Sequence, residues 1–307
     1  MSSFVTITHA DCLGHDTGPH HRERPWRLET VRGLIDEMEL PVIEAREAND
    51  EDLLLGHDPA YLEALEEVFA REEHADLDSD THVSPGSRRA SRLGAGGALQ
   101  AVDLVLSGEA KRVFVATRPP GHHATRTRAM GFCIYGNTGL AALHALERHG
   151  LSRVAVLDFD VHHGNGTQDI LWDEPRSLFI SSHQEPKSLW PGTGVRSETG
   201  AHDNVLNLPL ASGSGASEMK VAWEDGLARL EAFKPELIIV SAGFDAHRED
   251  DISGLLWTAG DYWWLTNAIR GVARRCCEGR IVSCLEGGYN PTALAEGATA
   301  HLEALAR

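Results

Sequence analysis

The stretch VAVLDFDVHHGNGT, residues 154–167, decides the fold class and the chemistry that we predict for this chain. Its first four residues, 154–157, form an apolar, β-branched run that is typical of a strand buried in a parallel sheet. Asp158, Asp160 and His162 follow, and side-chain alternation places all three on one side if the extended backbone continues. Two carboxylates and an imidazole this close destabilise one another unless a cation neutralises them. The stretch therefore predicts a strand that ends in a metal site or a capping cluster.

Segments of strand and helix character alternate on both sides of this stretch. Strands are expected at residues 4–8, 112–116, 154–159, 177–181, 237–241 and 280–284. Helices are expected at residues 25–38, 59–71, 88–106, 137–149, 166–172, 217–233, 259–277 and 291–306. This alternation predicts an α/β fold with one parallel sheet flanked by helices on both faces. Because the sequence has no internal repeat, linker or break in composition, we expect a single domain over residues 1–307.

The composition narrows the classes of partner and the compartment. With 46 acidic and 28 basic residues and a net charge of −18, the chain is a poor candidate for binding nucleic-acid phosphates. It has no apolar run of membrane-spanning length and no signal-peptide pattern at its start, so we expect no membrane partner. Five cysteines without a CxxC pair favour free thiols in a reducing compartment. A cytoplasmic location is therefore expected.

Polar, glycine-flanked clusters follow four of the expected strands. Besides residues 158–163, they are PPGHH at 119–123, AGFDAH at 242–247 and EGGY at 286–289. The ligand site of an open parallel sheet lies outside the carboxyl ends of its strands. Four such clusters are hard to explain as packing, because each places polar groups beside a buried core. We therefore expect them to converge on one active site.

The residue types in these clusters favour a catalytic metal. Asp160, His162 and Asp245 offer two oxygens and one nitrogen and leave a coordination position open, which is the pattern of catalytic zinc. Such a metal lowers the pKa of its water and polarises a carbonyl group.

Four further side chains supply the other functions that hydrolysis needs. His122 and His123 titrate near neutrality and can act as acid and base. Asp158 can orient one of these imidazoles, and Tyr289 can donate its hydroxyl to a developing oxyanion. Together with the metal site, these residues predict metal-assisted hydrolysis of an amide or an ester.

Six motifs in one order resemble the histone deacetylase superfamily, which includes acetylpolyamine amidohydrolases and acetoin-utilisation proteins. The motifs are RPPGHHA at 118–124, GFC at 131–133, DFDVHHGNGTQ at 158–168, PGTG at 191–194, SAGFDAH at 241–247 and LEGGYN at 285–290. The resemblance covers nearly the whole chain. It implies the arginase-like fold, with a single parallel sheet of about eight strands between helical layers.

The resemblance also implies a role for individual residues. It makes Asp160, His162 and Asp245 the ligands of one catalytic Zn²⁺. His123 becomes the general base and then the acid, His122 its companion hydrogen-bonded to Asp158, and Tyr289 the group that polarises the scissile carbonyl. The resemblance also implies six substrate-binding residues. Gly131 offers its backbone carbonyl, and Phe132 and Trp190 face each other across an acyl-lysine tunnel. Ile252 lies at the tunnel mouth, Asp80 at its rim, and Arg27 in an acetate-release channel. A structural K⁺ is implied at the carbonyls of Asp158, Asp160, His162 and Ser182, with the Ser181 hydroxyl.

This sequence departs from the family pattern in a few loops. Asn165 is the expected partner of His123, where some branches have Asp, and a neutral partner stabilises imidazolium less. Arg22 and Asp251 each stand where the family usually has Pro, and Gly136 stands where it commonly has Asn. These departures concern loop shape and substrate choice rather than the metal ligands.

The favoured function is removal of an acetyl or similar short acyl group from an amine, with an N-acetyl-lysine side chain as the substrate shape. One alternative is acetylpolyamine hydrolysis. A second is a dimanganese ureohydrolase like arginase, which needs more bridging carboxylates. A third is an inactive homologue that binds an acylated ligand. The choice between a peptide and a small-molecule acyl-amine partner, the choice between zinc and iron, and the oligomeric state stay open.

Overall fold

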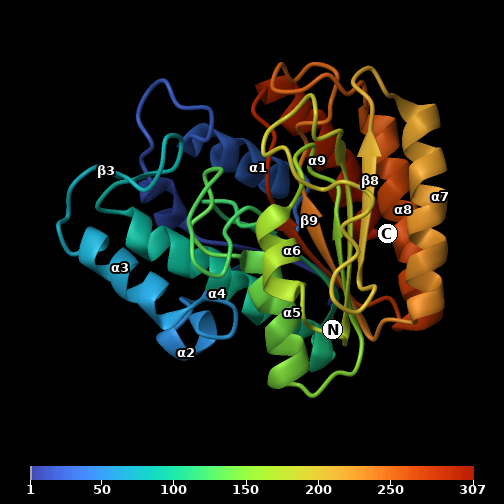
Figure 1. Ribbon diagram of the computed structural model, residues 1–307, viewed down its shortest axis with the longest axis horizontal. Coiled ribbons are helices and arrows are strands. Elements are labelled where there is room, and N and C mark those ends of the chain that lie inside the picture. The colour runs from blue at the N-terminus through green and yellow to red at the C-terminus, as the bar shows by residue number, and fades with distance from the viewer. Residues whose placement is uncertain (1) are drawn as a thin grey trace.

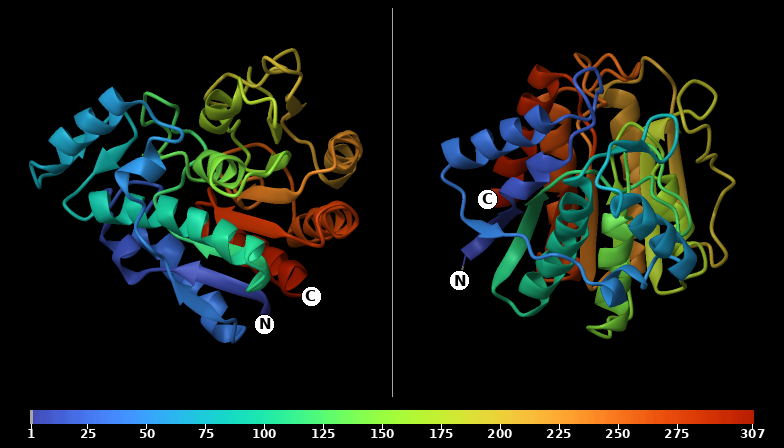
Figure 2. Two further views of the ribbon diagram at one scale, coloured as in Figure 1. Left: turned by 90° about the horizontal axis from the view of Figure 1, so that it is seen from below. Right: turned by 90° about the vertical axis from the view of Figure 1, so that its left-hand side faces the viewer.

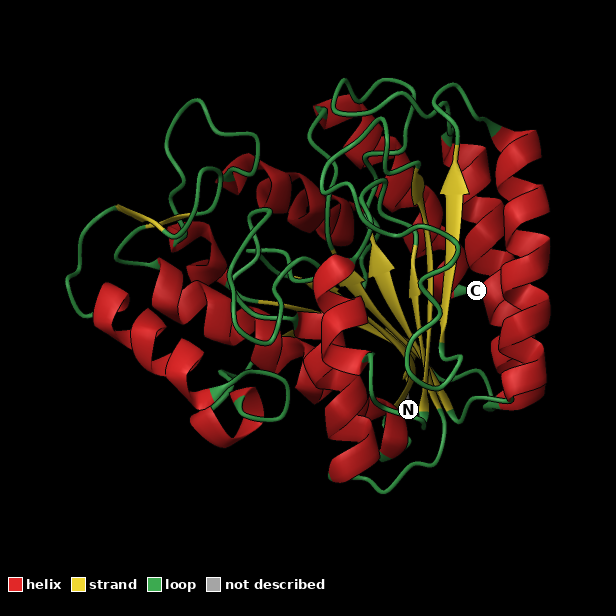
Figure 3. Cartoon of the chain, in the orientation of Figure 1, coloured by secondary structure: helices red, strands yellow, loops and turns green. Residues whose placement is uncertain are grey.

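A computed structural model describes residues 2–307 and contains one large sheet of eight strands (Figures 1 and 3). In spatial order the strands are β2 (Val42–Glu44), β1 (Ser2–Thr8), β5 (Ala110–Ala116), β10 (Ile281–Leu285), β9 (Leu237–Ala242), β6 (Val154–Asp158), β7 (Ser177–Gln184) and β8 (Val205–Leu210). Every neighbouring pair in this sheet is parallel, which confirms the predicted sheet.

Helices cover both faces of the sheet (Figure 2). One layer contains α1 (Pro25–Glu37), α7 (Ala216–Phe233), α8 (Ala259–Cys276) and α9 (Pro291–Ala306). The other contains α4 (Ser87–Leu106), α5 (Asn137–Glu147) and α6 (Asn165–Leu171). The 3₁₀ helix η1 (Ala10–Gly14), helices α2 (Asp50–Leu53) and α3 (Pro59–Phe69), and the small hairpin of β3 (Ala75–Asp76) and β4 (His82–Val83) lie outside these layers. No helix within residues 2–307 has the length and apolar character needed to cross a bilayer.

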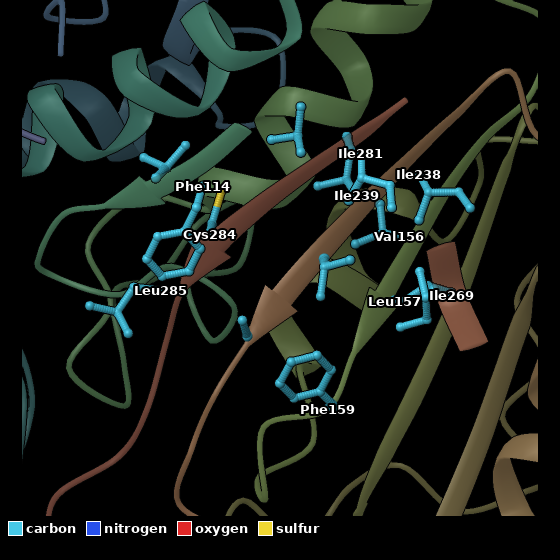
Figure 4. Packing of buried hydrophobic residues seen from close by; sticks show 14 of the residues in the cluster. Phe114, Val156, Leu157, Phe159, Ile238, Ile239, Ile269, Ile281, Cys284 and Leu285 are labelled. Atoms are coloured by element: carbon cyan, nitrogen blue, oxygen red, sulfur yellow. The ribbon is translucent and has the colours of Figure 1, made fainter. Parts of the chain in front are cut away.

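The central strands are buried along their whole length. All five residues of β6 and of β10, and all six of β9, are buried. Their side chains form one continuous core, in which Figure 4 labels Val156, Leu157, Ile238, Ile239 and Ile281. Burial on both faces requires apolar residues on both sides of a strand, which explains the uninterrupted hydrophobic runs of the sequence.

The sequence prediction missed the two edge strands, β2 and β8. β2 is only three residues long, which is too short for a periodic signal. β8 has the sequence VLNLPL, and Pro209 argues against a strand because proline cannot donate a ladder hydrogen bond. The structure accommodates Pro209 because, within residues 2–307, β8 pairs with β7 alone and has no strand partner on its other edge.

Candidate active site

The carboxyl ends of β6 and β9 bring the three predicted metal ligands together. Asp160 and His162 lie in the turn after β6, and Asp245 follows β9. His162 Nδ1 is 3.0 Å from Asp160 Oδ1 and 3.2 Å from Asp245 Oδ2. One ligand atom from each of the three residues lies within 4.8 Å of the other two, and all three side chains are buried. This geometry suits a single metal ion.

The electrostatics of this group also fit a cation. Asp245 Oδ2 is buried and makes no hydrogen bond within residues 2–307, and its near neighbour His162 Nδ1, at 3.2 Å, is itself a candidate metal ligand. Burial and the neighbouring charge of Asp160 raise the pKa of Asp245 to about 6. A Cβ atom at Gly287 would overlap the carboxylate oxygens of both aspartates, and one at Gly243 would overlap Asp160, so glycine lets the carboxylates approach the backbone. Two buried carboxylates, one with an oxygen that makes no hydrogen bond to the described residues, are what a divalent metal ion would neutralise.

Two histidines with different partners stand beside this group. His122 Nδ1 lies 3.0 Å from Asp158 Oδ2, and His123 Nδ1 lies 2.8 Å from Asn165 Oδ1, so both predicted pairs are present. Their ring centroids are 3.9 Å apart. Both acceptors are oxygens, so the Nδ1 atom of each ring carries the proton and donates it. Each Nε2 atom is therefore left without a proton when the ring is neutral.

The environments of the two rings push their pKa values apart. Burial alone would lower the pKa of His122, but the carboxylates of Asp160 and Asp158 outweigh it and raise the pKa well above its ordinary value. Burial and the positive charges of His122 and His162 lower the pKa of His123 well below its ordinary value. Pairs whose pKa values are pushed in opposite directions are typical of acid–base sites.

A pocket of about 270 Å³ leads to these groups. Its lining residues are Asp80, His123, Gly131, Phe132, His162, Leu189, Trp190, Ile252 and Tyr289. The pocket therefore brings together five of the six predicted substrate-binding residues. The aromatic rings of Trp190 and Phe132 pack edge-on against His123 and Tyr289, with centroid distances of 4.7 and 5.6 Å.

Arg27, the sixth of these residues, lies beneath the pocket instead of lining it. Its buried guanidinium donates from Nε to the Gly288 carbonyl at 2.7 Å and lies 4.7 Å from the centre of the Tyr289 ring. Its Nη1 atom donates to Glu23 at 3.1 Å, and Arg118 also binds Glu23 through two hydrogen bonds of 2.7 Å. Arg27 thus supports the segment that carries Tyr289.

Arg22 and Asp251, the two residues that stand where the family usually has Pro, form an ion pair. Arg22 Nη1 lies 2.6 Å from Asp251 Oδ1, and both side chains are largely exposed. Asp251 therefore points away from the pocket, and Ile252 supplies the lining, as predicted. Asp250, in contrast, is buried and accepts the backbone N–H groups of Tyr289 and Asn290 at 2.6 and 3.1 Å.

The residues expected to hold K⁺ lie at the end of β6, in the turn that follows it and in the neighbouring strand β7. Asp158 of β6 is in register with Ser181 of β7. The Ser181 hydroxyl hydrogen-bonds to His183 Nδ1 at 2.9 Å, and the Ser182 hydroxyl accepts from Trp223 Nε1 at 3.1 Å. The described contacts leave the monovalent-cation assignment a prediction.

Sequence reasoning included Glu286 in a strand-end cluster but gave no role to its buried carboxylate. Glu286 Oε2 accepts the backbone N–H groups of Gly121 at 2.7 Å and His122 at 3.1 Å. Burial raises the pKa of Glu286 to about 7, although the charge of His122 opposes this. An acidic residue directly after the apolar run of residues 281–285 was the available signal, because a carboxylate at a buried strand end needs a partner.

Comparisons with known proteins agree with this geometry. The histone deacetylase domain matches residues 21–305. A histone deacetylase-like amidohydrolase of Pseudomonas aeruginosa is 37% identical over 304 residues, covering 91% of this chain and 80% of that protein. A probable deacetylase of Methanothermobacter thermautotrophicus is 39% identical over 307 residues, covering 98% and 90%. The crystal structure of the HDA15 HD domain superposes with a TM-score of 0.93 at 32% identity, covering 99% of this chain and 88% of that one.

The parallel sheet and the buried group at its strand ends define a hydrolase of the arginase/deacetylase fold. Within that class, the chain belongs to the histone deacetylase family of deacetylases and amidohydrolases.

Proposed function

We propose that this chain is a zinc-dependent deacylase that removes acetyl or a similar short acyl group from the amine of an N-acetyl-lysine-type substrate. One observation carries the proposal. The Asp160, His162 and Asp245 group, with a buried carboxylate oxygen that makes no hydrogen bond to the described residues, adjoins a pocket that also exposes His123 and Tyr289. A ligand-binding module has no need for a metal group, a base and a hydroxyl donor on one pocket.

Zinc suits this donor set, because one imidazole and two carboxylates are ligands that it accepts in catalytic sites. A zinc ion held there would polarise the scissile carbonyl and increase the acidity of a water molecule. Among the described residues around the pocket there is one such group of three ligands, which disfavours the two-metal arrangement of a ureohydrolase.

His123 is the proposed general base and then the general acid. Its Nδ1–H donates to Asn165 Oδ1, so Nε2 takes the proton of the attacking water and returns it to the leaving amine. His122 donates Nδ1–H to Asp158 and keeps a raised pKa. It therefore serves as a charged neighbour that keeps the pKa of His123 low rather than as the base.

Tyr289 is the proposed donor to the developing oxyanion. Burial raises the pKa of its phenol well above 10, so the hydroxyl keeps its proton at neutral pH. Its backbone is held by Asp250 from one side, and its ring rests on Arg27 from the other. A donor fixed before the reaction stabilises the transition state without reorganisation.

The lining of the pocket favours a single-amine or peptide substrate. Phe132, Trp190 and Ile252 give the pocket apolar walls that suit the methylene stem of lysine. Asp80 also lines the pocket, and its carboxylate is the proposed acceptor of a substrate N–H. The same carboxylate makes acetylpolyamines the second candidate, because it would attract a distal ammonium group.

Kinetics with metal analysis on one sample would test the proposal. The wild-type chain should hydrolyse acetyl-lysine peptides faster than acetylpolyamines and contain one tightly bound zinc ion in the pocket. Asp245→Asn should lose that ion and the activity, whereas Asp36→Asn, which changes an exposed aspartate, should lose neither. Full turnover by Asp245→Asn would refute the ligand assignment. A wild-type chain that binds zinc but hydrolyses none of these amides would refute the function.

A further inference from the structure

A second cluster of metal-ligand side chains lies away from the pocket, where α4 packs against α5. Asp103 belongs to α4, His144 to the last turn of α5, and His149 to the segment just after that helix. The Nε2 atoms of His144 and His149 lie 2.7 and 2.8 Å from the same oxygen, Asp103 Oδ1. One ligand atom from each residue lies within 4.8 Å of the other two. None of the three side chains lines the pocket.

We propose that Asp103, His144 and His149 bind a second divalent transition-metal ion, such as Zn²⁺. Imidazole and carboxylate are the ligands that such ions share in proteins. With metal–ligand bonds of about 2.0–2.1 Å, tetrahedral ligands lie roughly 3.3 Å apart, so the two contacts with Asp103 need to widen by only about half an ångström. His149 is exposed and follows the end of α5, so it can make this adjustment.

Metal binding requires the cluster to give up protons. His144 is buried, and its Nδ1 atom makes no hydrogen bond within residues 2–307. Its Nε2 atom faces a carboxylate oxygen that can only accept, so Nε2 carries the proton in the metal-free protein. A metal ion would displace that proton, which can move to Nδ1. Coordination would replace two N–H donations to Asp103 with two bonds to the ion.

The surrounding charges decide how tightly an ion would be held. Arg46 is the nearby cation, with Nη2 3.6 Å from Asp103 Oδ2. Arg46 also binds Asp52 Oδ2 at 3.0 Å, so it keeps a carboxylate partner if a metal ion takes Asp103. The net charge of −18 raises the local concentration of cations around the whole chain.

A bound ion would join three separate segments and stabilise the folded state. The ligands come from α4, from α5 and from the connection that leads into β6. Because the unfolded chain does not hold these ligands together, binding adds to stability in proportion to the logarithm of the free metal concentration. The proposed role is structural and is independent of the proposed deacylase activity.

Zinc stoichiometry would test this second site. After equilibrium dialysis against Zn²⁺ alone, the wild-type chain should hold two ions and His149→Ala one. His74→Ala, which removes an exposed histidine elsewhere, should still hold two. Asp245→Asn, which changes only the pocket group, should keep the ion of the second site and bind it with wild-type affinity.

Thermal unfolding of the zinc-loaded enzyme supplies a second measurement. Extra Zn²⁺ should raise the unfolding temperature of the wild type and of His74→Ala, but should do so far less for His149→Ala, whose turnover should equal that of the wild type. Asp103→Ala should weaken binding at the second site by roughly tenfold or more. A wild-type chain that holds one ion, or an unchanged second ion in His149→Ala, would overturn the proposal and leave a hydrogen-bonded surface cluster.

Discussion

Replacing Glu23 with Gln should strongly destabilise the folded chain. Glu23 is completely buried and accepts two hydrogen bonds from Arg118 and one from Arg27. The nearby His15 is neutral at pH 7, because burial lowers its pKa to about 3. Glu23→Gln would therefore leave two buried guanidinium groups without their counter-charge.

The expected loss in the free energy of unfolding is about 3 kcal/mol. Breaking a buried ion pair from one side costs about 3–5 kcal/mol, because the remaining charge stays desolvated. The lower end applies here, since Arg118 keeps the carbonyls of Cys12 and His15 and Arg27 keeps that of Gly288. Since total stabilities are about 5–15 kcal/mol, the variant should still fold.

The pH dependence of stability gives this prediction a second readout. Burial alone would raise the pKa of Glu23, but Arg118 and Arg27 outweigh it and hold the pKa well below its ordinary value. A lowered carboxyl pKa contributes stability that is complete above the unfolded pKa of about 4.3 and is lost as the pH falls below it. Between pH 5 and pH 3, the free energy of unfolding of the wild type should therefore fall by about 2 kcal/mol more than that of Glu23→Gln.

Urea denaturation of both proteins, with Glu29→Gln as a matched control, would measure these values. Glu29 is exposed on α1, the helix that begins two residues after Glu23, so its replacement should change stability by less than about 0.5 kcal/mol. The reasoning would be refuted if Glu23→Gln differed from the wild type by no more than Glu29→Gln does, or if both lost stability equally on acidification.

Three further predictions concern the chemistry of the pocket. Tyr289→Phe should keep its metal and its fold but lose about 10²–10³ in kcat, the usual cost of one oxyanion donor, and wild-type turnover would contradict that role. Asn165→Asp should raise the pKa of His123, because a carboxylate favours imidazolium, and should therefore move the His123 limb of the kcat/KM–pH profile to higher pH. An unmoved profile would mean that the two side chains are not in contact during turnover. Ile252→Glu should shift the kcat/KM ratio toward acetylpolyamines by roughly tenfold, about 1.4 kcal/mol for one partly exposed charge pair, and should be compared with Ile252→Gln to separate charge from size.

The metal group was predictable because strand ends in a parallel sheet are a geometric constraint. Asp160 and Asp245 are far apart in sequence, but each follows a buried strand, and β6 and β9 are neighbours in the sheet. Carboxyl ends of parallel strands meet at one edge, so polar clusters after each strand converge without further information. The pairing of His123 with Asn165 was predictable only through the family resemblance.

Interactions between loops were not predictable, because a single sequence carries no signal for them. Arg22 and Asp251 looked like two unrelated departures from the family pattern, yet they form one ion pair. Because both are exposed, the pair itself contributes little stability. The roles of Asp250 and Glu286 were not predictable for the same reason. Each carboxylate accepts backbone N–H groups of a segment that is distant in the sequence.

The position of β10 has a consequence for the order in which the protein is assembled during synthesis. This strand leaves the ribosome after the other seven strands of the described sheet, yet it lies in the middle of the sheet, between β5 and β9. Until residues 281–285 are made, β5 and β9 each lack the strand that separates them. Two central edges therefore stay open, and open edges are prone to pair with other chains. The nascent protein must keep these edges from pairing with other chains until β10 is made, and Tyr289, which follows β10, reaches the pocket only after it.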